Sequence, residues 1–294
     1  MNETPWKVSL HGGHSGEFCD HATGTLREVL DAAIAAGFTT YGVSEHVPRI
    51  GEQYLYENEI ALGWTVEKIV ADFERYGAAI FALAEEYADR LTVLRGFEIE
   101  VVPHNNYVEV MSGYRKRFKF DYMVGSVHYI DDISIDGLPK EFERALELHG
   151  GLEPLAIHYY ESVAEMVRAL KPEVVGHLDL IRKNGHLYGS VDSPAIQEAA
   201  RATLEVIRDC GGILDLNTAG WRKGLDHAYP EPWLLQLAHS MGVPFCFGDD
   251  SHGPTLVGAG IDDARRYLLE HGIDQVTVLG RNGDSVCRQE ISLK

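Results

Sequence analysis

The feature that most constrains the fold is an alternation of short β-like runs with longer helical patterns along nearly the whole chain. The order strand, helix, strand, helix is typical of a parallel sheet covered by its connecting helices. The first predicted strand lies near Val8, and the others cover residues 38–43, 92–97, 122–127, 174–176, 212–217, 243–248 and 276–279. The predicted helices cover 25–36, 65–89, about 141–170, 193–209, 231–240 and 262–271.

Polar residues follow these predicted strands at their C-terminal ends, and this placement favours a barrel. Catalytic groups from many strand ends are typical of a (β/α) barrel, whereas an open sheet concentrates them at one switch point. About seven strand ends carry such a residue. We therefore predict a distorted (β/α)7 barrel, in preference to the eight-stranded form. No linker or repeat divides the sequence, so residues 1–294 are expected to form one domain.

Composition excludes several classes of partner. The chain has 26 Lys and Arg against 45 Asp and Glu, a formal net charge of −19, and no basic run longer than 115–117. This balance argues against binding to long nucleic acids. No signal peptide or apolar run of membrane-spanning length is present, and the four cysteines form no Cys-x-x-Cys motif. We therefore expect a cytoplasmic protein that does not bind membranes. Nucleotide-binding glycine motifs are also missing.

A histidine-rich stretch, residues 11–21, directly follows the first predicted strand and contains three imidazoles between glycines. A single histidine at a strand end is more often structural than a ligand. The joint placement of nine such residues instead indicates a multinuclear metal centre. Imidazole and carboxylate together suit zinc, iron or manganese. The nine candidate ligands are His11, His14, His21, His46, Glu98, His128, His177, Asp250 and His252.

Several short motifs resemble the PHP (polymerase and histidinol phosphatase) superfamily over nearly the whole chain. Beside the opening histidines, they are Ser44-Glu45-His46, Gly96-Phe97-Glu98, Gly125-Ser126-Val127-His128, Gly176-His177-Leu178-Asp179 and Gly248-Asp249-Asp250-Ser251-His252. Two further runs resemble its histidinol-phosphatase group, namely Leu180-Ile181-Arg182-Lys183 and Asn217-Thr218-Ala219-Gly220-Trp221-Arg222-Lys223, the second followed by Tyr229-Pro230.

The resemblance implies three divalent metal ions at the mouth of a distorted seven-stranded barrel. In the family pattern, one ion takes the first histidines with Glu98 and Asp250, and a second shares Glu98 with His128 and His177. The third takes His21, His46 and His252. Glu98 suits a bridging role because a carboxylate offers two oxygens to two cations.

The opening motif departs from the family pattern, which usually reads His-x-His. Here the spacing is His11-Gly12-Gly13-His14, and Gly12 stands where the first histidine is expected. Either His11 reaches into the site through the flexible glycines, or one ligand is missing and the first metal ion is held more weakly.

The resemblance implies a phosphomonoesterase that hydrolyses L-histidinol phosphate, a step of histidine biosynthesis. A metal-bridging hydroxide would attack phosphorus. Arg182 and Arg222 are candidates for binding the phosphate because guanidinium matches phosphate oxygens, and Lys223 follows in the same motif. Asp250 is also a candidate proton shuttle, but its role as a metal ligand in the family makes that role secondary.

Two alternatives to this activity stay open. One is a phosphatase of the same superfamily that acts on another small phosphorylated substrate, because substrate specificity depends on loops such as residues 47–64. The other is a non-catalytic module that binds metal for structure. The sequence indicates no oligomeric state.

Overall fold

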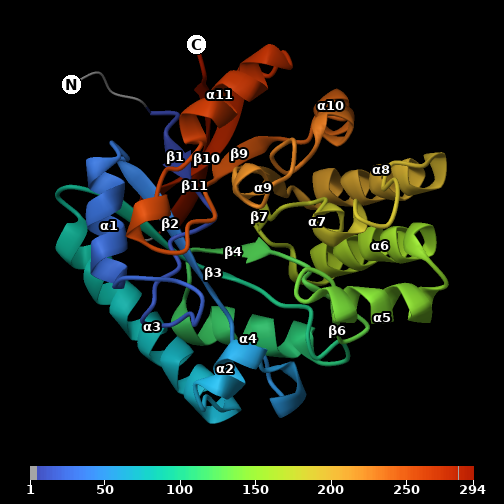
Figure 1. Cartoon of the computed structure of the whole chain (residues 1–294). Coiled ribbons are helices and arrows are strands. Elements are labelled where there is room, and N and C mark those ends of the chain that lie inside the picture. The colour runs from blue at the N-terminus through green and yellow to red at the C-terminus, as the bar shows by residue number, and fades with distance from the viewer. Residues whose placement is uncertain (1–4, 284) are drawn as a thin grey trace.

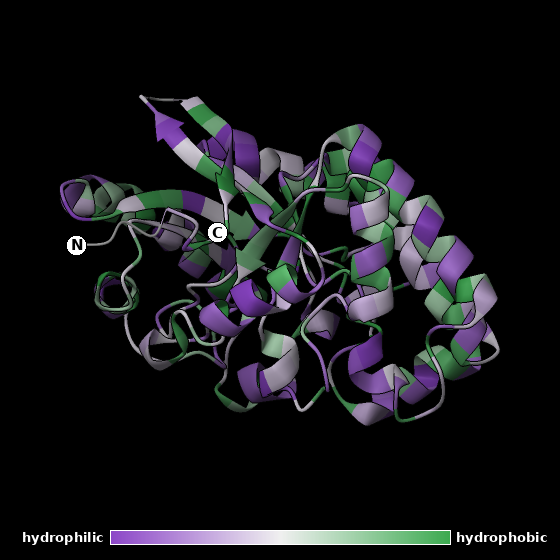
Figure 2. Cartoon of the chain, turned by 90° about the horizontal axis from the view of Figure 1, so that it is seen from above, coloured by the Kyte–Doolittle hydropathy of each residue, from purple (hydrophilic) through white to green (hydrophobic). Residues whose placement is uncertain are grey.

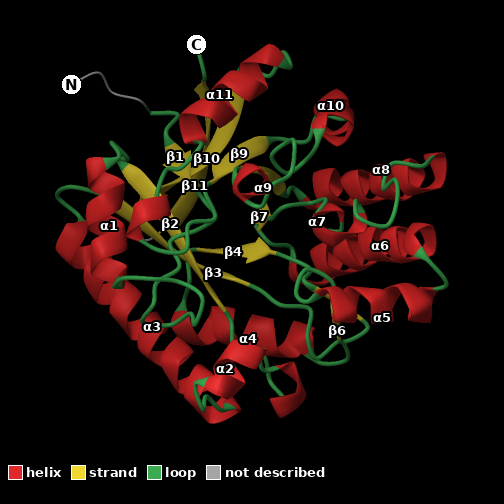
Figure 3. Ribbon diagram, in the orientation of Figure 1, coloured by secondary structure: helices red, strands yellow, loops and turns green. Residues whose placement is uncertain are grey.

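A closed barrel of seven parallel strands lies at the centre of the computed structural model, which describes residues 5–283 and 285–294 (Figures 1 and 3). The strands pair in the order β1-β2-β3-β4-β7-β8-β9, and pairing of Ser9 with Phe247 closes the ring. The predicted (β/α)7 barrel is confirmed. The strands are β1 Val8–Ser9, β2 Thr40–His46, β3 Thr92–Glu98, β4 Tyr122–Gly125, β7 Val174–Val175, β8 Ile213–Asn217 and β9 Phe245–Gly248.

Helices cover the outside of the barrel (Figure 3). α1 begins after Thr25, whose hydroxyl accepts from the backbone N–H of Glu28 while the Glu28 carboxylate accepts from that of Thr25. The longer helices are α1 Leu26–Ala35, α3 Val66–Tyr87, α4 Tyr107–Phe118, α5 Pro139–His149, α6 Leu152–Leu170, α8 Pro194–Cys210, α10 Pro232–Ser240 and α11 Ile261–Glu270. The short ones are η1 Glu52–Tyr54, α2 Glu57–Ala61, α7 Arg182–Gly185, α9 Ala219–Arg222 and η2 Pro254–Leu256.

One predicted helix, about residues 141–170, is in fact two helices, α5 and α6. Gly150 and Gly151 separate them with φ angles of 77° and 124°. Residues with side chains rarely adopt such angles, so the two glycines turn the chain between the helices. The prediction of one continuous helix was therefore wrong, because it missed this break.

Two hairpins, one long helix and the short helices were not predicted as such. α4 occupies residues for which no element was expected, and β5 Tyr129–Ile130 pairs with β6 Ile133–Ser134. The predicted last strand, 276–279, lies within β10 Gln275–Asn282. β10 pairs antiparallel with β11 Ser285–Ser292 and stays outside the barrel.

The hydrophobic core fills the barrel and the layer between its strands and the helices. α8 shows the pattern: its buried residues include Ile196, Ala200, Leu204 and Ile207, three or four positions apart on one face. In Figure 2 the helices correspondingly show hydrophobic and hydrophilic residues in alternating patches. In the described residues, no helix is both long enough and apolar enough to cross a membrane.

The register of the parallel strands brings their C-terminal ends to one edge of the barrel. β2 and β3 pair so that His46 lies beside Glu98. An isolated parallel bridge joins His14 to His252, and Asn217 of β8 pairs with Gly248 of β9. Residues at the C-terminal ends of different strands, or a few positions beyond them, therefore lie together at one mouth of the barrel.

Candidate metal centre

The structure brings together all nine candidate ligands at this mouth. His46 and Glu98 end β2 and β3, and the others lie in segments that follow β1, β4, β7 and β9. In several overlapping groups, the potential ligand atoms of three or four residues lie within 4.8 Å of one another. These groups together include His11, His14, His21, His46, Glu98, His128, His177, Asp250 and His252.

The carboxylate of Glu98 lies at the centre of the inner part of this cluster and is 1% exposed. Imidazole nitrogens approach both of its oxygens. The distances from Glu98 are 3.0 Å to His46 Nδ1, 3.2 Å to His11 Nε2, 3.2 Å to His177 Nε2, 3.5 Å to His128 Nε2 and 3.7 Å to His14 Nε2. This arrangement lets one carboxylate serve two cations, one at each oxygen.

Carboxylates also lie behind several imidazoles, on the side away from the cluster centre. The Nδ1–oxygen distances are 2.7 Å for His11 and Asp215, 3.3 Å for His14 and Glu45, 3.0 Å for His128 and Glu100, and 2.9 Å for His21 and Asp20. A carboxylate accepts a hydrogen bond from Nδ1–H, and Nε2 then keeps its lone pair, which faces the centre of the cluster. Such pairs of carboxylate and histidine are typical of metal sites.

Five buried polar atoms in the cluster have no hydrogen-bond partner. Buried polar atoms are nearly always satisfied, so a group of exceptions in one place needs an explanation. The atoms are His11 Nε2, His14 Nε2, His46 Nδ1, His177 Nδ1 and Glu98 Oε2. Neutral nitrogens and carboxylate oxygens that share a buried space form a donor set for divalent cations.

Burial and neighbouring charges shift the titration of the cluster. Burial lowers the pKa of His14 to about 4, and burial with the neighbouring histidines also lowers the pKa of His46. Burial opposes ionisation of Glu98 and Asp250, but adjacent cationic groups outweigh it and hold both pKa values well below the usual range. At neutral pH the cluster therefore contains neutral His14 and His46 beside ionised Glu98 and Asp250.

Neighbouring carboxylates outweigh burial at His11 and His128, so the pKa of His11 lies well above its usual range and that of His128 is raised to about 9. A metal ion that binds these two imidazoles must therefore displace a proton from each.

The structure decides where the first histidine of the opening motif lies. His11 is fully buried and its Nε2 faces Glu98, so His11 reaches the cluster through the glycines. Gly12 has a φ of 141° and packs on the segment after β9. A Cβ at Gly12 would lie 2.2 Å from Asp249 Oδ1 and 2.8 Å from the backbone nitrogen of Ser251. Position 12 therefore has no room for a histidine.

Two residues of the cluster have backbone angles that L-amino acids rarely adopt. Asp250 has a φ of 46° and His177 a φ of 26°. Angles of this kind cost about 1–3 kcal/mol and persist where the surroundings hold them. The N–H of Asp250 donates to the His11 carbonyl at 2.8 Å, and the N–H of His177 donates to Asp215 Oδ1 at 2.6 Å. These bonds fix how both side chains enter the cluster.

Two predicted substrate-binding residues, Arg222 and Lys223, line a cavity of about 290 Å³ beside the cluster. The guanidinium of Arg222 donates to the backbone carbonyls of Asp249 and Asp250 and, at 2.9 Å, to Thr218 Oγ1. Most of its donors are therefore taken by the protein. Lys223 Nζ lies 3.6 Å from Asp250 Oδ2.

The expectation that Arg182 binds phosphate needs correction. Its side chain is 7% exposed and is not part of the cavity wall. Arg182 Nε lies 3.1 Å from Asp179 Oδ2, and Nη2 donates to the carbonyl of Ala228 at 2.7 Å. The guanidinium thus ties two loops together. Its motif was identified correctly, but a guanidinium matches backbone carbonyls as well as phosphate.

The cavity also contains residues that were not assigned to the site from sequence. Those with polar side chains are Tyr56, Glu100, Asp136 and Lys183. Lys183 directly follows Arg182 in the same motif, so the motif signalled the right segment, and the structure turns the next residue toward the cavity. Lys183 Nζ lies 3.2 Å from Asp136 Oδ2. Glu100 and Asp136 have no such sequence signal.

Comparison with known proteins shows extensive similarity to one family. Residues 11–219 match the PHP domain. A Schizosaccharomyces pombe protein named "probable histidinol-phosphatase" is 34% identical over 286 residues, which span 94% of this chain and 90% of that protein. The histidinol-phosphatase of Saccharomyces cerevisiae is 31% identical over 295 residues, which span 88% of each chain.

A solved structure shares the fold. It is that of histidinol phosphate phosphatase from Lactococcus lactis in complex with zinc, L-histidinol and phosphate, with a TM-score of 0.71 and 19% identity, and it covers 96% of this chain and 99% of that one. The family match and the two fungal relatives extend the agreement to sequence. The chain therefore belongs to the PHP family, in its histidinol-phosphatase group.

Proposed function

We propose that this chain is a metal-dependent phosphomonoesterase that hydrolyses L-histidinol phosphate to L-histidinol and phosphate. The observation that carries the proposal is the buried cluster around Glu98, where imidazoles approach both carboxylate oxygens. Relatives that span about nine tenths of the chain are histidinol-phosphatases by name. The activity places the protein in histidine biosynthesis.

The donor set supports three metal-binding positions. His11, His14, Glu98 and Asp250 would hold one ion, and Glu98, His128 and His177 a second. His21, His46 and His252 would hold the third. Such ions lower the pKa of a bound water and polarise a phosphate oxygen. Zinc, iron and manganese all suit imidazole and carboxylate ligands.

The chain's own residues would bind and orient the substrate. Lys223 and Lys183 line the cavity beside the cluster and are suited to contact phosphate oxygens. Arg222 would act on the reaction through Asp250, whose carbonyl it binds and whose backbone angle it helps to hold. Asp250 lies 3.6 Å from Lys223 and has a secondary role as proton shuttle: its ionised carboxylate would accept a proton from the attacking water and pass it to the leaving alcohol.

A second cavity, of about 370 Å³, is suited to the other end of the substrate. It shares His21, Tyr56, Asp136 and Lys183 with the first cavity. Its further wall is aromatic and acidic and includes Tyr54, Tyr129, Asp132 and Glu141. L-Histidinol carries an ammonium group and an imidazole, and carboxylates and tyrosine rings attract both. The cavity would therefore favour a cationic, aromatic amino alcohol.

A substrate panel tests the proposal. Purified protein loaded with zinc or manganese is assayed for phosphate release from L-histidinol phosphate, glycerol phosphate and p-nitrophenyl phosphate. We expect kcat/KM for L-histidinol phosphate to exceed the others by at least about 100-fold, which corresponds to about 2.7 kcal/mol of transition-state stabilisation. Similar values for all three would contradict the substrate assignment. Bound metal without turnover of any would favour a non-catalytic module.

A further inference from the structure

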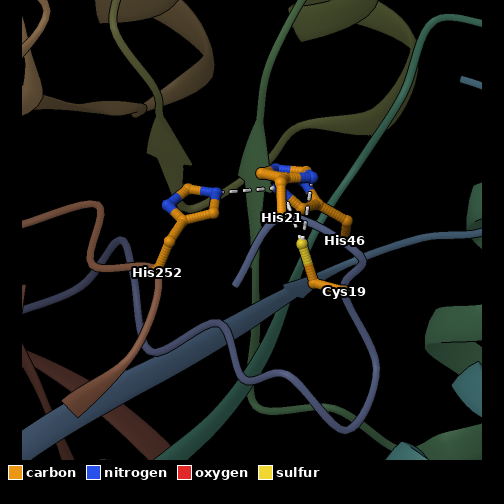
Figure 4. A group of neighbouring side chains, drawn as sticks. All are labelled: Cys19, His21, His46 and His252. Atoms are coloured by element: carbon orange, nitrogen blue, oxygen red, sulfur yellow. Dashed lines mark hydrogen bonds between the residues drawn. The ribbon is translucent and has the colours of Figure 1, made fainter. Parts of the chain in front are cut away.

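A second group of imidazoles lies outside the metal centre, whose outer histidines are drawn in Figure 4. Asp131 stands in the two-residue turn between β5 and β6, His149 is the last residue of α5, and His158 lies in α6. None of the three lines either cavity described above. The phosphatase chemistry proposed above therefore assigns no task to this group.

Both imidazoles approach the same carboxylate oxygen with Nε2. The distances to Asp131 Oδ2 are 3.5 Å from His149 Nε2 and 3.4 Å from His158 Nε2. Both exceed the usual N–H···O hydrogen-bond distance of about 2.7–3.2 Å. His149 Nε2 is buried and has no hydrogen-bond partner. Because buried polar atoms are nearly always satisfied, this nitrogen calls for another kind of partner.

The separations match ligand atoms around one ion. Zn–N bonds of about 2.0–2.1 Å and Zn–O bonds of about 2.0–2.2 Å, at tetrahedral angles, place nitrogen and oxygen about 3.3–3.5 Å apart. Two imidazoles on one zinc ion have ring centres about 5 Å apart, because each ring centre then lies about 3 Å from the ion. The ring centres of His149 and His158 are 5.0 Å apart. Both kinds of distance therefore fit a single shared ion.

The charges around the two imidazoles favour a cation. Burial and the neighbouring His158 lower the pKa of His149, so this imidazole is neutral at neutral pH. A second carboxylate, that of Glu161, lies 3.5 Å from His158 Nδ1 and favours the tautomer with its proton on that nitrogen. Within the part of the chain that the structure describes, neither Asp131 nor Glu161 pairs with a lysine or an arginine. The negative charge of this group therefore has no counter-charge from the basic side chains.

We propose that Asp131, His149 and His158 form a peripheral zinc site, separate from the metal centre at the barrel mouth. Two imidazoles and one carboxylate suit zinc and similar transition metals, and three protein ligands leave the fourth position to water. The ion would tie the β5–β6 turn to α5 and α6. Tyr129 and Asp132 of the same hairpin line the second cavity, so the ion would also steady one wall of that cavity. The site does not depend on the phosphatase activity.

Counting bound zinc tests the site. Wild-type protein, His158→Ala, Asp131→Asn and His239→Ala are dialysed against the same series of free zinc concentrations, and zinc per chain is measured by mass spectrometry. The His158 side chain is 36% exposed, and asparagine tolerates the φ of 46° at position 131, so both variants should fold. His239, exposed near the end of α10, is the matched control. We expect His158→Ala and Asp131→Asn to bind one zinc fewer per chain than wild type, and His239→Ala to match wild type.

Amide hydrogen exchange locates the additional ion. Zinc should slow exchange in residues 129–134 more in wild type and His239→Ala than in His158→Ala and Asp131→Asn, because only the first two tie the turn to the helices. Equal zinc content in all four proteins would overturn the site. Equal protection of residues 129–134 in all four would overturn it as well. If His158→Ala does not fold, Asp131→Asn decides by the same two measurements.

Discussion

Single side chains outside the nine candidate ligands decide how the imidazoles are aimed. Asp215, in β8, accepts from His11 Nδ1 at 2.7 Å and from the backbone N–H of His177 at 2.6 Å. Both carboxylate oxygens are therefore used. The buried carboxylate of Asp215 thus orients the side chain of His11, 204 residues away in sequence, and the backbone of His177, 38 residues away.

The substitution Asp215→Asn tests this role. An amide has only one acceptor oxygen, so its NH₂ group must face one of the two donors and that bond is lost. We expect metal affinity, measured by chelator competition, to fall about 10- to 100-fold with the fold retained. Asp209→Asn, at an exposed carboxylate paired with Arg208, is the control and should leave the affinity unchanged. Equal affinities in both variants would show that Asp215 does not orient the ligands.

Gly12 permits a second test at the residue scale. Its φ of 141° and the close approach of Asp249 and Ser251 leave no room for a Cβ, so Gly12→Ala should push the opening motif away from β9. We expect lost metal and a lower melting temperature. Gly37→Ala is the control, because Gly37 has a φ of 85° but open space around it. If Gly12→Ala bound metal as wild type does, the packing described for His11 would be wrong.

The sequence predicted which residues gather but not what lies behind them. All nine candidates end or follow strands of one barrel, and the ends of parallel strands meet at one edge, so their proximity follows from chain order. Asp215 and Glu100 carry no such signal, because their roles depend on side-chain direction within the folded barrel. Arg182 shows the same limit, since its motif was correct but its guanidinium faces Asp179.

At the scale of elements, the alternation of strand and helix patterns predicted the barrel. Where one helix ends and which strands pair depended instead on glycine backbone angles and on tertiary packing. The break at Gly150–Gly151 depends on φ angles that helical periodicity does not report. The run 276–279 is strand-like in sequence, but whether it joins the barrel or pairs with β11 depends on tertiary packing. The polar composition of residues 107–118 likewise concealed α4.

The segment with η1 and α2 is held to the barrel by a buried ion pair between Arg49 and Glu59, whose side chains are 5% and 4% exposed. Arg49 also donates from Nε to the Tyr54 carbonyl at 2.9 Å and lies 3.6 Å from the ring centre of Tyr56. This pair therefore positions two tyrosines of the second cavity.

Removing only Arg49 should lower the free energy of unfolding more than removing both Arg49 and Glu59. Arg49→Leu leaves Glu59 buried without a counter-charge, and we expect urea unfolding to show a loss of about 3–5 kcal/mol. Adding Glu59→Leu should restore part of it. KM for L-histidinol phosphate should rise in both variants. An unchanged unfolding free energy in Arg49→Leu would contradict the anchoring role, with Arg27→Leu, at the exposed pair with Glu86, as the neutral control.

At the scale of the whole molecule, the barrel collects ligands from along the chain, from His11 near its start to His252 near its end. Each proposed ion would therefore connect segments that follow different strands. Glu98 is the residue on which two of the proposed positions depend, because both of its oxygens face imidazoles. The central claim is that Glu98 binds metal ions on which hydrolysis of the phosphomonoester depends.

Glu98→Gln tests that claim most directly, because it keeps the shape of the side chain and removes its charge. Metal content by mass spectrometry and phosphate release from L-histidinol phosphate are measured together, with Glu57→Gln, at an exposed carboxylate paired with Lys140, as the control. The account predicts that Glu98→Gln folds, loses bound metal and loses turnover by more than about 100-fold, beyond the usual effect of a group behind a ligand, while Glu57→Gln matches wild type. Wild-type metal content and turnover in Glu98→Gln would contradict it.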